Sequence, residues 1–179
     1  MSVSGGGSCH PGCSLAFTAA ASDADSDRLT YSWLGAGCSC SSSTSAVSCS
    51  LTALGTCTAS VTVSDGHGHT VSASGSGDGV NAAPALAGPG SAHVGANSTG
   101  SFRFNVTDDD PANTGSCSAS SEDSSVQVNG CSFVSGSGNV WQVNLKTGAP
   151  LSGGYTIVSA TFTDKWGASG SVVVKVYVP

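Results

Sequence analysis

Acidic residues gather in a few short segments, and their type and spacing could do chemistry. Two sets share this character: Asp23, Asp25, Asp27 and Asp65 early in the chain, and Asp108, Asp109, Asp110 and Asp164 later. Carboxylates that converge without cations repel one another, and calcium, which takes about six to eight hard oxygen ligands, removes that repulsion. We therefore expect calcium at these sets, with ordinary solvated Asp-initiated turns as the alternative.

Other chemistry is less well supported by the residues present. A glycosidase carboxylate pair needs a cleft with sugar-binding aromatics, and the chain has one Glu, three Trp, three Tyr and five Phe. His67 and His69 flank Gly68 and could share a metal ion, or be exposed turn histidines. No Gly-x-Ser-x-Gly elbow or helical segment presents a nucleophilic serine. The sequence therefore predicts a protein that is not an enzyme.

The composition predicts the kind of scaffold that must position these residues. The chain of 179 residues has 25 Gly, only 9% charged residues and a net charge of −6. Thr, Val, Ser and Gly dominate and no segment has a sustained helical period, which favours an all-β fold. The five scattered Lys and Arg residues argue against nucleic-acid binding, and no apolar run is long enough to span a membrane.

Eight cysteines are many for a chain of this length. No Cys-x-x-Cys motif occurs, and the close pairs Cys9/Cys13 and Cys38/Cys40 lack the partner pair of a structural zinc site. An even cysteine count with small cores is typical of disulfide-bonded proteins in oxidising compartments. We expect an extracellular or cell-surface protein, with reduced cytosolic cysteines as the alternative.

The sequence contains two copies of one unit. TASVTVSDGHG (58–68) aligns without a gap with IVSATFTDKWG (157–167), so that Asp65 falls on Asp164. A Gly/Pro/Ala-rich segment, 75–90, lies between the copies and marks a boundary. We therefore place a first domain at 1–82 and a second at 83–179.

The repeated segments carry a family resemblance. SDADSDRLTYSW, ASVTVSDGHG and NAAPALAGPG resemble the polycystic-kidney-disease-type and cadherin-like immunoglobulin-fold repeats of prokaryotic surface proteins. The resemblance covers most of residues 15–90 and, in weaker form, 91–178; the second copy has NTGSCSAS where the first has Leu-Thr-Tyr-x-Trp. It implies two tandem immunoglobulin-like β-sandwiches stapled by disulfides.

Alternating apolar residues predict where the strands of each sandwich lie. We expect strands at 15–21, 28–34, 46–51, 57–64 and 69–73 in the first unit, and at 100–107, 115–120, 126–133, 140–145, 155–163 and 169–178 in the second. The segment before Leu15 shows little apolar alternation. We therefore expect the first strand of unit 1 to be short or absent.

The resemblance also suggests a disulfide pattern. Cys13 and Cys57 share the parity of inward residues, so a Cys13–Cys57 bridge would copy the inter-sheet disulfide of immunoglobulin domains. Cys49 would pair with Cys38 or Cys40, and Cys9 with the one that is left. Cys117 and Cys131 are the only cysteines of the second unit, so we expect them to bond to each other.

These features predict an extracellular structural protein: a surface or filament subunit that binds copies of itself head-to-tail through sheet edges or chain ends. The alternative is an adhesin or carbohydrate-binding accessory module of a larger secreted protein, in which Trp166 and Trp141 stack on cell-surface glycans. Two sequons, at Asn97 and Asn105, are candidate glycosylation sites.

Overall fold

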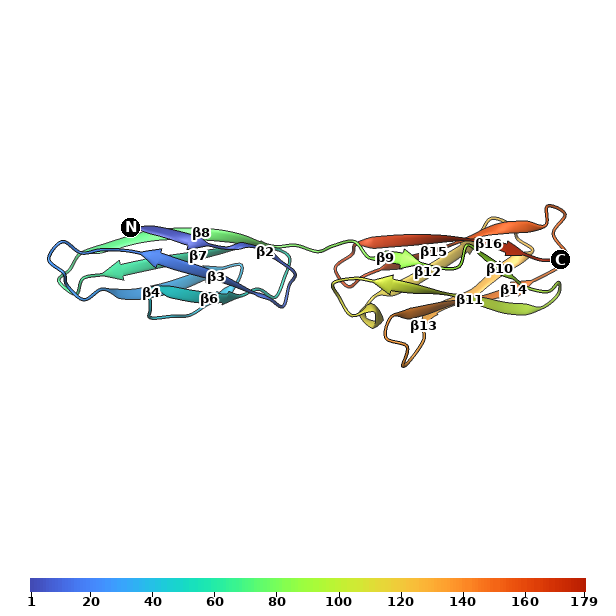
Figure 1. Ribbon diagram of the computed structural model, residues 1–179, viewed down its shortest axis with the longest axis horizontal. Coiled ribbons are helices and arrows are strands. Elements are labelled where there is room, and N and C mark those ends of the chain that lie inside the picture. The colour runs from blue at the N-terminus through green and yellow to red at the C-terminus, as the bar shows by residue number, and fades with distance from the viewer. The chain divides into compact units, whose positions relative to one another are not determined.

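The computed structural model describes residues 1–179 and confirms the all-β prediction. The chain divides into two compact units, unit 1 (Met1–Asn81) and unit 2 (Ala82–Pro179). Each unit is a sandwich of two four-stranded sheets (Figure 1). The structure contains no helix that is long and apolar enough to cross a membrane.

Unit 1 pairs its eight strands into two sheets. One sheet has the order β1 (Ser2–Gly5), β3 (Ser14–Ala20), β6 (Ala46–Ser50), β5 (Ser39–Cys40). The facing sheet has the order β2 (Gly7–Cys9), β8 (Thr70–Gly79), β7 (Gly55–Ser64), β4 (Thr30–Ala36). In β3 every second residue is buried, which is the period that places one face of a strand against the core.

Unit 2 repeats this strand order. One sheet runs β9 (Ala85–Ala87), β11 (Thr99–Thr107), β14 (Val140–Thr147), β13 (Val126–Phe133). The other runs β10 (Ser91–His93), β16 (Ser169–Tyr177), β15 (Tyr155–Thr163), β12 (Ser116–Ser121), and a short 3-10 helix, Ala112–Thr114, precedes β12. The equivalence of the sheets confirms that the chain holds two copies of one immunoglobulin-like unit.

The first strand of unit 1 is present and short, which agrees with the expectation of a short or absent strand. It begins as β1, antiparallel to β3, and continues as β2, parallel to β8 in the facing sheet. The crossing uses Gly5, Gly6 and Gly7, which all have positive φ. A Cβ at Gly5 or Gly6 would collide with a backbone carbonyl of β3 or β8. Polar and glycine-rich strands lack the apolar alternation on which the sequence prediction depended.

Each unit has its own apolar core. In unit 1, Phe17, Trp33 and Val61 are buried between the sheets, and the indole N–H of Trp33 donates to the Thr44 carbonyl at 2.9 Å. In unit 2, the buried Trp141 contacts Phe162 edge-on and donates to the Ala112 carbonyl at 3.0 Å. These hydrogen bonds satisfy the only polar atom of each indole.

Four disulfides staple the sandwiches: Cys9–Cys13, Cys38–Cys57, Cys40–Cys49 and Cys117–Cys131. The predicted Cys13–Cys57 bridge is therefore wrong. Cys13 lies in a turn that brings it to Cys9 at the end of β2, where its N–H donates to the His10 carbonyl at 3.2 Å. The β4–β7 register, which opposes Ala36 to Thr58, instead brings Cys38 to Cys57.

Candidate functional site

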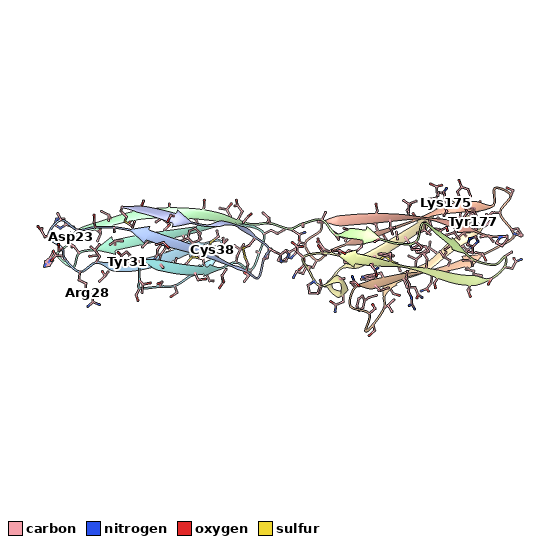
Figure 2. All side chains as sticks on the ribbon, viewed as in Figure 1. Asp23, Arg28, Tyr31, Cys38, Lys175 and Tyr177 are labelled. Carbon is pink, nitrogen blue, oxygen red and sulfur yellow. A yellow bond between two sulfur atoms is a disulfide. The ribbon has the colours of Figure 1, made fainter.

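The acidic turn of unit 1 is held together by its own backbone. Asp23 Oδ1 accepts hydrogen bonds from the N–H groups of Asp25 at 2.9 Å and Asp27 at 3.1 Å. This is the local bonding that favours Asp at the start of turns. Figure 2 labels Asp23 at one end of unit 1, well away from Cys38.

Asp65 organises the turn between β7 and β8 in the same way. Its Oδ1 accepts from the N–H groups of His67 at 2.7 Å and His69 at 3.2 Å, and its Oδ2 lies 2.9 Å from His69 Nδ1. The hydrogen bond from the His67 amide, followed by the contacts with His69, lowers the pKa of Asp65 from its ordinary value. His67 Nδ1 lies 3.4 Å from Asp27 Oδ2, so each histidine meets a different carboxylate.

The unit 1 carboxylates do not converge on one point. Asp23, Asp25, Asp27 and Asp65 form no group of three with oxygens within 4.8 Å of one another. Their oxygens serve backbone amides and the two histidines instead. The calcium prediction for these four residues therefore gains no geometric support.

Three carboxylates of unit 2 do converge. Asp108, Asp110 and Asp164 each place an oxygen within 4.8 Å of the other two. Asp110 and Asp164 are 6% and 5% exposed. The Lys165 ammonium lies 2.7 Å from Asp110 Oδ1 and offsets part of this charge. We call Asp108, Asp110 and Asp164 the carboxylate cluster.

Asp108 is the member of the cluster whose charge is least compensated. Its Oδ1 accepts from the Asp109 N–H at 3.0 Å, whereas its Oδ2 is buried without a hydrogen-bond partner. Desolvation first, then a side-chain hydrogen bond with Asp109 and repulsion from Asp109 and Asp164, raises the pKa of Asp108 to about 6. A cation at this point would offset both the desolvation of the Asp108 carboxylate and its repulsion by the neighbouring carboxylates.

Asp164 holds its turn as Asp65 does in unit 1. Its Oδ1 accepts from the N–H groups of Trp166 at 2.7 Å and Ala168 at 3.0 Å, at the same sequence offsets as the amides on Asp65. The alignment of Asp65 with Asp164 is therefore a structural equivalence. The units differ in what the other acidic segment meets at this turn: in unit 2 Asp108 and Asp110 approach Asp164 itself, whereas in unit 1 Asp27 meets His67.

The tryptophans proposed to stack on sugars lie in different environments. Trp141 is 6% exposed and belongs to the core, so that part of the prediction is wrong. Trp166 is half-buried, and the Lys165 ammonium lies 5.2 Å from its ring centre. The side chains of Asn97 and Asn105 are exposed, as a glycosylation site requires.

A row of aromatic side chains on unit 2 was missed by the sequence analysis. His93 of β10, Tyr177 of β16 and Tyr155 of β15 are neighbours in strand register. The His93 and Tyr177 rings stack with centres 4.8 Å apart, the Tyr155 ring follows at 5.4 Å, and Lys175 lies 5.0 Å from the centre of Tyr155. Figure 2 labels Lys175 and Tyr177 on this strand. We call His93, Tyr155 and Tyr177 the aromatic row; its members lie too far apart in sequence for a motif to reveal them.

Comparison with known proteins finds a family that resembles the first unit. Residues 1–74 match the family model of the PKD domain. Unit 1 is similar to the PKD domain over these residues. The PKD domain is a non-catalytic module, and with this match the resemblance seen in the sequence is confirmed. No curated protein matches the chain in sequence.

Solved structures with a similar arrangement are immunoglobulin-like and cadherin arrays. Titin domains I67–I69 are 12% identical with a TM-score of 0.44, over 97% of this chain and 62% of that one. The human desmocollin-1 ectodomain is 14% identical with a TM-score of 0.41, over 97% of this chain and 40% of that one. The chain thus spans less than two thirds of each, and at these values the likenesses carry no argument about function.

PKD and immunoglobulin-like repeat domains are typical of extracellular and surface proteins. The four disulfides of this chain are consistent with an extracellular location, because disulfides persist in oxidising compartments.

Proposed function

We propose that the protein is an extracellular structural subunit that assembles head-to-tail into filaments through its sheet edges. The observation that supports this is strand β4, which forms an open edge of its sheet. β4 carries no Lys or Pro, and its Leu34 is 72% exposed. Edge strands that must stay single are usually guarded by charge, proline or a bulge.

The equivalent edge of unit 2 has the same character. Strand β12, with the sequence SCSASS, also lies at a sheet edge and carries no charge. The other long edge of unit 2, β13, is interrupted by a register shift between Val128 and Gly130, a device that protects edges. β4 and β12 are thus the edges at which a strand of another copy would add.

The sheet faces next to these edges suit close packing. Across β4, β7 and β8 most of the outward residues are Ser or Thr; in one row Ser32, Thr62 and Ser72 lie side by side. Such a face carries few charges that would lose water when another copy approaches.

Electron microscopy and sedimentation of the purified chain test the proposal. Leu34→Lys places a charge on the edge strand, and the matched control Ser60→Lys places it on the directly opposed residue of the interior strand β7. Edge addition predicts filaments for wild type and Ser60→Lys and monomers for Leu34→Lys. Loss of filaments only in Ser60→Lys, or a wild-type monomer at high concentration, would contradict edge assembly.

We further propose that the carboxylate cluster of unit 2 binds calcium and thereby stabilises the subunit. Support comes from the hard oxygen ligands, the buried Asp108 Oδ2 and the raised pKa of Asp108. Terbium, a luminescent substitute for calcium, would be sensitised by Trp166, whose backbone N–H donates to Asp164 Oδ1. Luminescence should be lost in Asp108→Asn and retained in the unit 1 control Asp25→Asn; equal luminescence in both variants would refute the site.

The second candidate function is that of an adhesin or carbohydrate-binding module, and the aromatic row favours it. Tyr155 is 43% exposed, and exposed rings with a nearby Lys suit sugar stacking. A glycan array would show binding by wild type and none by Tyr155→Ala. Equal binding by the two proteins would exclude the row as the sugar site.

A further inference from the structure

Four of the eight cysteines of the chain come together in unit 1. The Sγ atoms of Cys38, Cys40, Cys49 and Cys57 all lie within 4.8 Å of one another. Cys49 and Cys57 are fully buried, whereas Cys38 and Cys40 are half-buried. We call these four residues the cysteine quartet.

The quartet draws on both sheets of the sandwich. Cys40 of β5 and Cys49 of β6 are direct partners in one sheet. Cys57 lies on β7 of the facing sheet, and Cys38 lies in the bend that follows β4 of that same sheet. The disulfides Cys40–Cys49 and Cys38–Cys57 therefore each join neighbours on one side. They meet across the sandwich, where Cys38 Sγ lies 3.7 Å from Cys40 Sγ.

This arrangement is close to that of a four-thiolate metal site. A tetrahedral zinc ion with Zn–S bonds of about 2.3 Å places its sulfur ligands about 3.8 Å apart. The sulfurs of different disulfides lie no more than 4.8 Å apart. One of these distances, from Cys38 Sγ to Cys40 Sγ, is 3.7 Å. Only the two bonded pairs would have to separate, from about 2.0 Å to about 3.8 Å.

We propose that, once its two disulfides are reduced, the cysteine quartet binds one thiophilic divalent cation of the zinc class. Two molecules of a dithiol reductant supply four electrons and four protons, and become two disulfides themselves. The chain then carries four thiols, and metal binding releases their four protons as the thiolates form. Atoms and electrons balance without any further reactant.

The metal form differs from the disulfide form in what it connects. Each disulfide links positions on its own side, whereas one ion bonded to all four sulfurs links β5 and β6 to β4 and β7. Gly35 is part of this site, because a Cβ there would lie 2.8 Å from Cys40 Sγ. Under conditions that reduce thiols, unit 1 thus keeps a cross-link, and this cross-link joins its two sheets.

Cobalt titration of the reduced chain tests the proposal, with the remaining cysteines as an internal control. The variant C9S/C13S/C117S/C131S keeps only the quartet, and C40S/C49S removes half of it. After air-free reduction with a phosphine and its removal, wild type and the quartet-only variant should bind one Co²⁺ with tetrahedral four-thiolate absorption. Zinc should displace the cobalt, and X-ray absorption of the zinc form should show four sulfurs at about 2.3 Å.

The outcomes are distinct. Loss of the four-thiolate spectrum in C40S/C49S, with retention in the quartet-only variant, is the expected result. A quartet-only variant that binds no cobalt, or binds it with fewer than four sulfurs, overturns the proposal whether or not C40S/C49S folds. The result is independent of filament assembly, because it is measured on the reduced subunit in solution.

Discussion

Replacing Asp108 by Asn should stabilise unit 2 at pH 8 when calcium is absent. The folded pKa of Asp108 is about 6, against an ordinary 3.8. A carboxyl with a raised folded pKa holds its proton more tightly in the folded state, so stability falls as the pH rises from about 3.8 to about 6. The Asn side chain carries no charge, and the variant should not lose this stability.

The size of the effect follows from the pKa difference. Each pKa unit corresponds to about 1.4 kcal/mol, so the full shift sets an upper limit of about 3 kcal/mol. Asp108 is only half-buried, and solvent screening reduces this to about 1 to 1.5 kcal/mol. For a unit of this size, that stabilisation raises the melting temperature by roughly 4–8 °C.

Native-state hydrogen exchange of the β11 and β15 amides measures this stability separately from that of unit 1. The gain for Asp108→Asn should be present at pH 8 with a chelator and should vanish near pH 3. Saturating calcium should reverse its sign, because only wild type then gains about 2.7 kcal/mol at a hundredfold excess over Kd. A variant no more stable than wild type at pH 8, or a gain unchanged at pH 3, would refute the assigned cause.

Three further predictions concern the scaffold. Gly35→Ala should destabilise unit 1 by about 2 kcal/mol or more through overpacking against Cys38 and Cys40, whereas Gly90→Ala, with no atom near its Cβ, should have little effect in the same urea unfolding assay. Trp141→Phe should cost unit 2 about 1–3 kcal/mol, because it leaves the Ala112 carbonyl without the indole donor; an unchanged unfolding midpoint would count against that role. Non-reducing peptide mapping should recover Cys38 with Cys57 and Cys40 with Cys49, and recovery of a Cys13–Cys57 peptide would contradict the structure.

The sequence alone determined the features that depend on local order. Alternation of apolar residues predicted the longer strands, such as 57–64 for β7 (Gly55–Ser64) and 155–163 for β15 (Tyr155–Thr163). Burial on one face of a strand requires a period of two, so this signal survives in a single sequence. The match of Asp65 to Asp164 also followed, because each residue bonds amides two and four positions further along the chain.

The sequence did not predict the short strands, because they carry no such period. β1, β2, β9 and β10 are three or four residues long, too short for alternation to be seen. The glycines between β1 and β2 look like a loop in sequence. Their positive φ angles and, at Gly5 and Gly6, the close approach of β3 and β8 explain why they must be glycine.

The tertiary structure decided which segments that are distant in sequence contact one another. The alternation of inward residues correctly placed Cys57 in the core. It could not show that Cys57 bonds to Cys38 rather than to Cys13, because this pairing depends on the β4–β7 register and on the turn that brings Cys13 to Cys9. The same limit applies to the acidic residues. Both sets have similar spacing, yet only Asp108, Asp110 and Asp164 converge. They do so because the chain after β11 brings its carboxylates to the turn after β15. The carboxylates of unit 1 instead bond to their own backbone amides and to the two histidines.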